Sequence, residues 1–464
     1  MRRYLALPVI LGCLSASVDV VMAQQTSVGV PTETTPGTEV RRAVNLRQCL
    51  ELAERHFPKV SQARARLHAK RAQAREARYA PFSEFTATGG LVLAPTVRGT
   101  ALYSPDTDQA LSSNMALAWQ AGLQGVVPLY TFGKIQNGWD AADAQEKLGE
   151  HDLKKEANEL RLNVRKAYYG ALLARDALAL IHEAKHKVDA ILERMTKDVA
   201  EGNGDDIELL KLKVHRSDLL SKESEVRRQQ AAALSGLKFL TGIRGELKLP
   251  AEPLRPAQHQ LGALDKYLAA ARLYRPEINM ARAGLAARRA LLRLEQSRRF
   301  PDVALGMNAK WAYAPEVVDQ TNPFVRDDGN YLHYGIGLVV RYKLDFLSRS
   351  ATIDRARADV EEVSASEQLA LGGIAQQVEE AFADVTESKR QLAICRDATQ
   401  LTKQWLIKVQ QGIDVGTMDE QDIVEPAKEY ALKRFAELSA IFTYDVALAK
   451  LAEVTGWDAI AEDR

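Results

Sequence analysis

The segment "VVPLYTFGKIQNGWDAADAQ", Val126–Gln145, begins with the alternation of a strand and ends in an Ala- and charge-rich stretch typical of a helix. Pro128 and Gly133 mark the change, and no further proline occurs before Pro250. A second segment, "LVVRYKLDFLSRSATIDRARADV", Leu338–Val360, makes the same change much later in the chain. Two places where a strand passes directly into a very long helix therefore decide the fold.

Composition limits the class of protein. A chain of 464 residues is too long for one compact core, and its 62 basic and 61 acidic residues leave a net charge of only +1. This balance argues against a nucleic-acid-binding protein, which needs a basic surface to displace counterions from phosphates. The sequence carries no phosphate-binding loop, nucleophile elbow or dinucleotide motif. We therefore expect that the protein is not an enzyme and that it binds no cofactor.

The first residues have the pattern of an export signal. A charged start, an apolar run at Leu5–Leu14 and small residues before a cleavage point predict a signal peptide over residues 1–23. The alternative is a lipoprotein signal in which Cys13 is acylated. Residues 24–43 are rich in Thr, Gly and Pro and have no periodicity, so we expect a flexible leader.

The remainder is an internal repeat. "VRKAYYGAL" around Tyr168 aligns with "VEEAFADVT" around Phe382, a shift of 382 − 168 = 214 residues. "EGNGDDIEL" at Gly202 aligns with "DVGTMDEQDI" at Gly416 with the same shift. Such self-similarity indicates a repeated structural unit. The chain is predicted to divide into a first repeat, a proline-rich linker and a second repeat, at 44–248, 249–262 and 263–464.

Each repeat is predicted to hold an N-terminal helical segment, two strands and a long helical hairpin. In the first repeat these are helices at 44–80, strands at about 84–94 and 114–130, and a hairpin at 137–240. In the second they are a helix at 263–299, strands at about 302–314 and 331–346, and a hairpin at 353–454. In the first hairpin, the apolar residues from Leu178 to Val199 recur at steps of three, four and seven, which is typical of coiled-coil packing.

The strands alternate over an unusual length. In the last of them, every second residue is apolar: Leu332, Tyr334, Ile336, Leu338, Val340, Tyr342 and Leu344. Outer-membrane strands place apolar side chains toward lipid and small or polar ones toward a lumen in this way. Two hairpins cannot close a barrel, because an edge facing lipid would leave backbone groups unpaired. Further copies of the chain must therefore complete it.

The sequence resembles the TolC-type outer-membrane efflux channels. The resemblance rests on the strand-to-helix junction "PLYTFGK" with Pro128 and Gly133, on the hairpin turns "EGNGDDIELL" and "DVGTMDEQDIVE", and on the helix starts "HFPKVSQARA" and "YRPEINMARA". It implies a mainly α fold with transmembrane β structure. Three chains would form a 12-stranded β-barrel in the outer membrane that continues into a 12-helix α-barrel in the periplasm.

The resemblance also implies a function. The chain would be the passive exit duct of a tripartite efflux or type I secretion system. Its partners would be two further copies of itself, a periplasmic adaptor, an inner-membrane pump and outer-membrane lipid, with no nucleic acid. The alternative is a periplasmic coiled-coil scaffold without a transport role, for which strands with a lipid-facing alternation would have no use.

Two groups of site residues follow. The hairpin turns, whose glycines permit a tight reversal, are expected to contact the adaptor through Gly202, Gly204, Asp205, Asp206, Gly416, Thr417, Asp419 and Glu420. Asp422 and Glu425 stand three residues apart, so they share one helix face. They correspond by motif to the acids at the periplasmic aperture of the family, with Glu208 as the match in the first repeat. The alternative is that they are ordinary acids near helix N-termini.

One motif points to a different chemistry. "HEAKH", His182–His186, fits the H-E-x-x-H pattern in which two histidines one helical turn apart bind zinc and the glutamate acts as a base. It lies in the middle of a long helix beside an apolar stripe, and no third ligand follows nearby. We therefore expect this segment to be structural, with no metal site and no catalytic residue.

Overall fold

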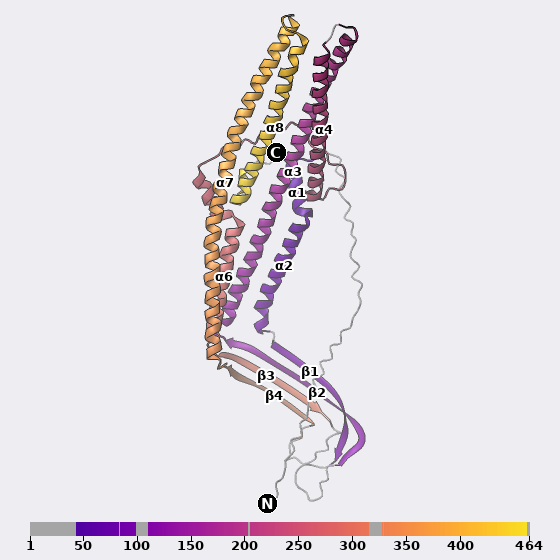
Figure 1. The fold of residues 1–464 in the computed structure, drawn as a ribbon. Coiled ribbons are helices and arrows are strands. Elements are labelled where there is room, and N and C mark those ends of the chain that lie inside the picture. Colours follow the sequence, from indigo (N-terminus) through magenta and orange to yellow (C-terminus); the bar gives the residue numbers. More distant parts are fainter. Residues whose placement is uncertain are drawn as a thin grey trace, which may run out of the picture.

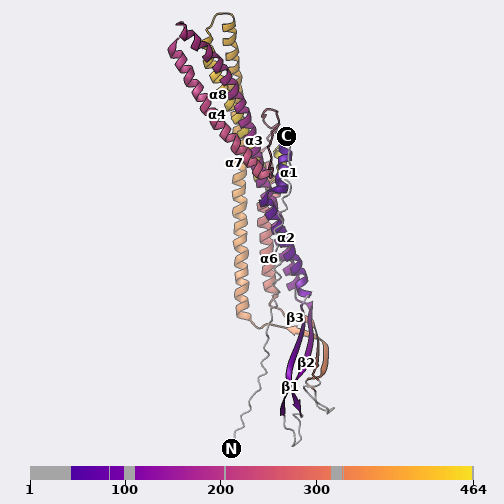
Figure 2. The same cartoon turned by 90° about the vertical axis from the view of Figure 1, so that its right-hand side faces the viewer.

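The computed structural model describes residues 43–82, 84–98, 110–202, 205–314, 327 and 329–461. The predicted signal peptide, the leader as far as Arg42, and Gly204 lie outside these residues. The described chain is elongated, with a sheet at one end and helical hairpins at the other (Figures 1 and 2).

The two repeats have the same order of elements. The first holds α1 (Leu46–His56), α2 (Pro58–Tyr79), η1 (Ala80–Phe82), β1 (Glu84–Arg98), β2 (Ala110–Tyr130), α3 (Lys134–Ala200) and α4 (Asp206–Thr241). The second holds α5 (Leu264–Tyr274), α6 (Pro276–Ser297), β3 (Asp302–Tyr313), β4 (Tyr331–Arg341), α7 (Phe346–Asp414), η2 (Glu420–Ile423), α8 (Val424–Thr455) and η3 (Asp458–Ile460). At 1.5 Å per residue, the 67-residue α3 is about 100 Å long.

The elements form three stacked rows of four. The antiparallel sheet has the order β1-β2-β3-β4. Above it, α2 packs on α3, α3 on α6, and α6 on α7, so the helices keep the order of the strands to which they are joined. Farther from the sheet, α4 packs on α3, α3 on α8, and α8 on α7. Each row is therefore an arc whose two outer elements have a neighbour in the row on one side only.

Prolines divide the N-terminal helical segment of each repeat. Arg275 has an extended ψ of 121° and Phe57 one of 122°, and each precedes the proline that opens the next helix. A residue before proline is driven out of the helical region, and proline itself suits the first helical position. The segment expected as one helix at 263–299 is therefore two helices, α5 and α6.

The last strand is shorter than its alternation suggests. β4 ends at Arg341 rather than at 346, because Arg341 pairs with Asp302, the first residue of β3, and no partner strand continues beyond it. Helix α7 then begins at Phe346 rather than at 353, with Asp345 as its N-cap residue. In the first repeat, α3 begins at Lys134 rather than at 137. The two strands of the first repeat are longer than expected. Strand β1 extends to Arg98 rather than to about 94, and β2 begins at Ala110 rather than at about 114.

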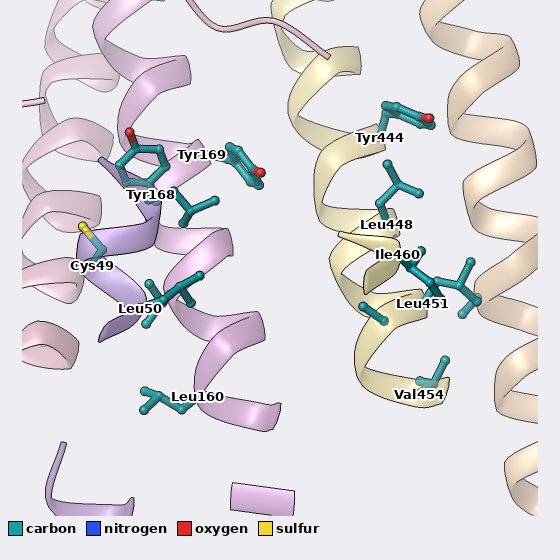
Figure 3. Close-up of a cluster of buried hydrophobic side chains, with 14 of the residues drawn as sticks. Cys49, Leu50, Leu160, Tyr168, Tyr169, Tyr444, Leu448, Leu451, Val454 and Ile460 are labelled. Carbon is teal, nitrogen blue, oxygen red and sulfur yellow. The ribbon is translucent and has the colours of Figure 1, made fainter. Parts of the chain in front are cut away.

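The main buried core lies at mid-height, where α1, α3, α5, α7, α8 and the linker meet. Tyr168 and Tyr169 of α3 belong to it, as do Leu448 and Leu451 of α8 (Figure 3). The linker is held on both repeats. The Leu254 N–H donates to Asp176 Oδ2 on α3 (2.7 Å), and the Ala257 N–H donates to Asp445 Oδ1 on α8 (2.9 Å). The two repeats thus share one core.

Candidate functional site

The sheet separates apolar from polar side chains. In register, Trp119 of β2 lies opposite Leu91 of β1 and Tyr313 of β3, and its ring lies 4.7 Å from that of Trp311. The same face carries the apolar residues Leu93, Leu117, Leu123, Leu305, Met307, Leu332, Tyr334, Ile336 and Leu338. The opposite face carries three valines, Val92, Val126 and Val339, but is otherwise mainly small or polar, with Thr86, Thr88, Gly90, Gln120, Gly122, Gln124, Gly306, Asn308, Lys310, His333, Gly335 and Gly337. This is the division expected of a wall between lipid and a wet lumen.

The first strand-to-helix junction turns on a left-handed backbone. Gly133, the N-cap residue of α3, has a φ of 85°, and Phe132 before it has a φ of 51°. Glycine adopts this region without the steric cost that a Cβ brings. Pro128 lies in β2 opposite Ala304, and the register shifts between Pro128 and Tyr130. The bulge and the left-handed pair redirect the chain from the sheet into the helix.

Side chains fasten this junction to the other repeat. Lys134 Nζ lies 2.7 Å from Asp302 Oδ1 and donates to the carbonyl of Phe300 at 2.8 Å. The Phe300 ring stacks on that of Phe132 with 5.2 Å between centroids. The sequence analysis missed the bond between Lys134 and Asp302, since nothing in the sequence pairs residues 168 positions apart. The only feature of the sequence that points to this bond is the place of Lys134 as the last residue of the junction motif "PLYTFGK".

Both hairpin turns contain glycine in the left-handed region. Gly202 has a φ of 81° and Gly416 a φ of 76°. Asp205 is the N-cap residue of α4, where its carboxylate accepts from the Ile207 N–H at 2.7 Å. In the second turn, the Thr417 hydroxyl donates to the Gly412 carbonyl at 3.0 Å. Asp206 opens α4, Asp419 is exposed, and Glu420 opens η2. The turns lie at the end of the molecule farthest from the sheet (Figure 1).

The three predicted aperture acids are exposed or partly exposed and lie near these turns. Asp422 accepts from the Asp419 N–H at 3.0 Å, so it also caps the short helix η2. Glu425 lies in the first turn of α8, 3.8 Å from Lys428 Nζ. Glu208, in the first turn of α4, forms an ion pair with Lys211. Lysines therefore partly neutralise these acids. The ion pair in the first repeat, between Lys211 and Glu208, is shorter than the one in the second, between Lys428 and Glu425.

The "HEAKH" segment faces a carboxylate across the hairpin. His182 Nε2 lies 3.3 Å from Glu223 Oε1 on α4, and Lys185 Nζ lies 3.5 Å from Glu223 Oε2. Arg227 forms a third contact with Glu223, whose side chain is mostly buried. Burial alone would raise the pKa of Glu223, but the hydrogen bond with His182 and the nearby cations outweigh it and lower the pKa. No cluster of three metal-ligating side chains is found in the described part of the chain.

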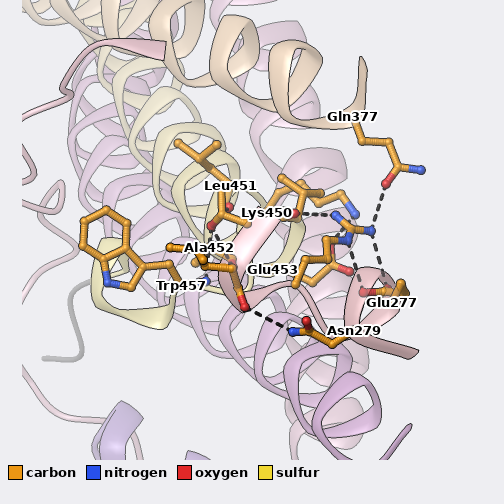
Figure 4. A network of polar contacts seen from close by, with 12 residues as sticks. Glu277, Asn279, Gln377, Lys450, Leu451, Ala452, Glu453 and Trp457 are labelled. Atoms are coloured by element: carbon orange, nitrogen blue, oxygen red, sulfur yellow. Dashed lines mark hydrogen bonds and ion pairs between the residues drawn. The ribbon is translucent and has the colours of Figure 1, made fainter. Parts of the chain in front are cut away.

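A buried arginine was also missed by the sequence analysis. Arg275, between α5 and α6, is 6% exposed. Its guanidinium donates to the Val454 carbonyl (2.6 Å) and to Gln377 Oε1 (2.9 Å), and its Nε lies 3.1 Å from Glu277 Oε2 (Figure 4). It thereby joins the second repeat's N-terminal helices to both helices of its hairpin.

No helix within the described residues has the length and apolarity needed to span a membrane. The search of curated proteins finds no match to the sequence.

Solved structures are similar in fold. The MtrE outer membrane channel of Neisseria gonorrhoeae in its open state has a TM-score of 0.73 at 17% identity, covering 90% of each chain.

Two further structures agree. The CmeC outer membrane channel of Campylobacter jejuni has a TM-score of 0.71 at 15% identity, covering 89% of this chain and 86% of that one. The outer membrane protein VceC of Vibrio cholerae has a TM-score of 0.65 at 17% identity, covering 89% and 96%. The family model described as "Outer membrane efflux protein" matches residues 49–243 and 267–457, one segment in each repeat. The chain therefore belongs to the outer membrane efflux protein family.

Proposed function

We propose that three copies of this chain close into one duct through which an export system releases its cargo across the outer membrane. The arc of four elements at each level supports this best. Three four-stranded sheets joined edge to edge would give twelve strands, and each helical row would likewise give twelve helices. Closure would pair the free edges of β1 and β4, which lipid cannot satisfy. It would also place the apolar face of the sheet outward.

The test is the oligomeric state of the protein extracted from membranes. Native mass spectrometry of the detergent-solubilised protein should show a trimer, and gel migration should change on heating as the assembly dissociates. The trimer should form channels in planar lipid bilayers. Recovery as a soluble monomer that forms no channels would contradict the proposal and favour the coiled-coil scaffold.

The energy for export must come from a partner. The sequence holds no phosphate-binding motif that could bind a nucleotide. We infer that an inner-membrane pump supplies it and that a periplasmic adaptor docks on the hairpin turns. Both turns expose acidic groups, such as Asp205 and Asp419, at the end farthest from the sheet. Reversing these charges with Asp205→Lys and Asp419→Lys should weaken adaptor binding without reducing trimer yield. Cross-links from these positions that reach only the channel itself would contradict the docking site.

We also infer that Asp422 and Glu425 form the acidic periplasmic aperture. Three copies would place six carboxylates around one constriction, and a ring of like charge attracts cations. Replacing both residues with alanine should reduce cation selectivity and the block by multivalent cations in planar bilayers. Because Asp422 also caps η2, Asp422→Asn is the control that keeps an oxygen acceptor while removing the charge. Unchanged selectivity and block in the double mutant would exclude this role.

A further inference from the structure

The polar face of the sheet carries two acidic and three basic side chains: Glu84, Asp302, Lys310, His333 and Arg341. Three of these lie at the end of the sheet that joins the helices, where Asp302 is paired in register with Arg341 and bonded to Lys134. Lys310 lies eight residues farther along β3 than Asp302. At 3.4 Å per residue, that is roughly 27 Å deeper into the strand region. The deeper charges are thus both on basic residues.

Lys310 and His333 are direct cross-strand partners in the β3–β4 ladder. Both side chains are exposed, and the His333 ring stacks on that of Tyr331 with 4.5 Å between centroids. Within the described residues, neither basic group has an ion pair or a hydrogen-bonding partner. On its other side, Lys310 lies opposite Gly122, and the uncharged hydroxyl of Thr88 closes the space that a side chain at Gly122 would take, 2.6 Å from an added Cβ. No acid therefore balances these two groups in their row of the sheet.

Like charges in directly opposite positions destabilise a sheet. The pairing of Lys310 with a histidine that can also become a cation therefore does not serve the stability of the fold. A lumen lined by one sign of charge and enclosed by walls of low dielectric constant concentrates ions of the opposite sign. Rings of lysine or arginine make pores selective for anions.

We propose that Lys310 and His333 form a basic ring inside the barrel that attracts anionic cargo, such as molecules bearing carboxylate, sulfonate or phosphate groups. The inference rests on the proposed function, since only a closed assembly has a lumen. It gives the duct acids at the hairpin turns and, farther along the barrel than Glu84 and Asp302, a row of bases. The substrate class favoured at the outer end is the anion.

The groups around the pair carry no negative charge. Tyr331 lies beside His333 on the same strand. Farther across the sheet, β2 presents the uncharged Gln120, Gly122 and Gln124 to the same face. None of these residues supplies a carboxylate that would balance the charge of Lys310.

The experiment measures block of single channels in planar bilayers by inorganic tripolyphosphate added on the barrel side. Lys310→Gln should weaken block about tenfold, given the counterion enrichment that charged clefts produce, whereas Lys310→Arg should retain it. His333→Lys, which places a permanent cation beside Lys310, should strengthen block. Asn308→Ala, on the same face one row away, should leave block unchanged.

Equal block in the wild type, Lys310→Gln and His333→Lys channels would overturn the basic ring while leaving the duct itself intact. Absence of any channel in the wild type would instead overturn the proposed function, and the ring with it. If Lys310→Gln fails to give a trimer that dissociates on heating, the comparison of the wild type with His333→Lys decides the question alone.

Discussion

The two repeats solve the same structural problem with different chemistry. At equivalent positions before the helix-opening proline, separated by 275 − 57 = 218 residues, the first repeat has Phe57 and the second has Arg275. Phe57 packs edge-on against Phe239 with 5.7 Å between centroids. Arg275 instead holds a buried network with Glu277, Gln377 and the Val454 carbonyl. The same backbone geometry is therefore compatible with either an aromatic contact or a buried ionic network at this position.

The hairpins show the same principle. Glu223 on α4 and Glu437 on α8 are equivalent, since 437 − 223 = 214, and both are mostly buried. Glu437 is held by Arg434 at 2.7 Å and faces Arg396 at 3.8 Å. His182 takes the position of Arg396 in the first repeat, because 396 − 182 is also 214. The position retains an acid, whereas the cations around it differ between repeats.

Removing the buried arginine should have the largest effect. Arg275→Met leaves Glu277 and the Val454 carbonyl without their partner, and breaking a buried ion pair costs about 3 kcal/mol. Phe57→Ala, at the equivalent but partly exposed site, should cost about 1–2 kcal/mol through lost apolar burial. Thermal unfolding followed by far-UV circular dichroism compares the two. Arg282→Met, at an exposed position on α6, is the control. Equal losses at both sites would show that the ionic network is no more sensitive than the aromatic contact.

Substitution of the turn glycines should have a smaller effect that is similar in the two repeats. Gly202→Ala and Gly416→Ala each place a Cβ in the left-handed region, which costs about 1–2 kcal/mol. The loss should appear as greater protease sensitivity of the corresponding turn. Gly236→Ala, in the interior of α4 with nothing within 4 Å of its new Cβ, is the matched control. Turns that resist protease as well as the wild type would contradict the expected strain.

The acid beside His182 should make the first hairpin sensitive to pH. The folded pKa of Glu223 is lowered from its ordinary value of 4.5, so its charge contributes stability at neutral pH that is lost as the pH falls below 4.5 and through the folded pKa. Glu223→Gln should therefore unfold at a lower temperature than the wild type at pH 7, and the difference should shrink in acid. A difference that is constant from pH 7 to pH 3 would show that charge is not the cause. Glu437→Gln, measured in parallel, reports on the equivalent position.

The smallest effect is expected from the histidines. His182→Gln with His186→Gln retains side chains of similar size, and both positions are exposed. Fold, trimer yield and channel formation should be unchanged. Metal analysis of the wild type should show no zinc. Stoichiometric zinc that disappears in the double mutant together with channel formation would restore the metal interpretation of "HEAKH".

The sequence predicted what local rules determine. A mainly α chain of two tandem repeats, each with long alternating strands, is confirmed. What it could not predict depends on partners far along the chain. The alternation runs past Arg341 to Leu344, and only the start of β3 at Asp302 shows where the ladder ends. Nothing in the sequence around Arg275 indicates that it is buried, because its partner Val454 lies 179 positions farther along the chain.

The site residues follow the same division. A left-handed φ at Gly202 and Gly416 could be anticipated from glycines in tight reversals. The bond between Lys134 and Asp302 joins the two repeats and has no local signature. The pairing of Lys310 with His333 has no local signature either, because it depends on the register of the β3–β4 ladder. Repeat comparison identifies equivalent positions, but it does not identify which strands face each other.

The open edges of each four-element arc have a genetic consequence. If three copies close into one ring as proposed, a chain damaged only at β1 or β4 would still fold its core and still join a neighbour through the intact edge, so it would enter assemblies rather than be discarded. In a cell that makes equal amounts of damaged and intact chains, only about one three-membered ring in eight would contain none of the damaged copies. Edge mutations should therefore be dominant, whereas mutations that prevent the mid-height core from forming should be recessive.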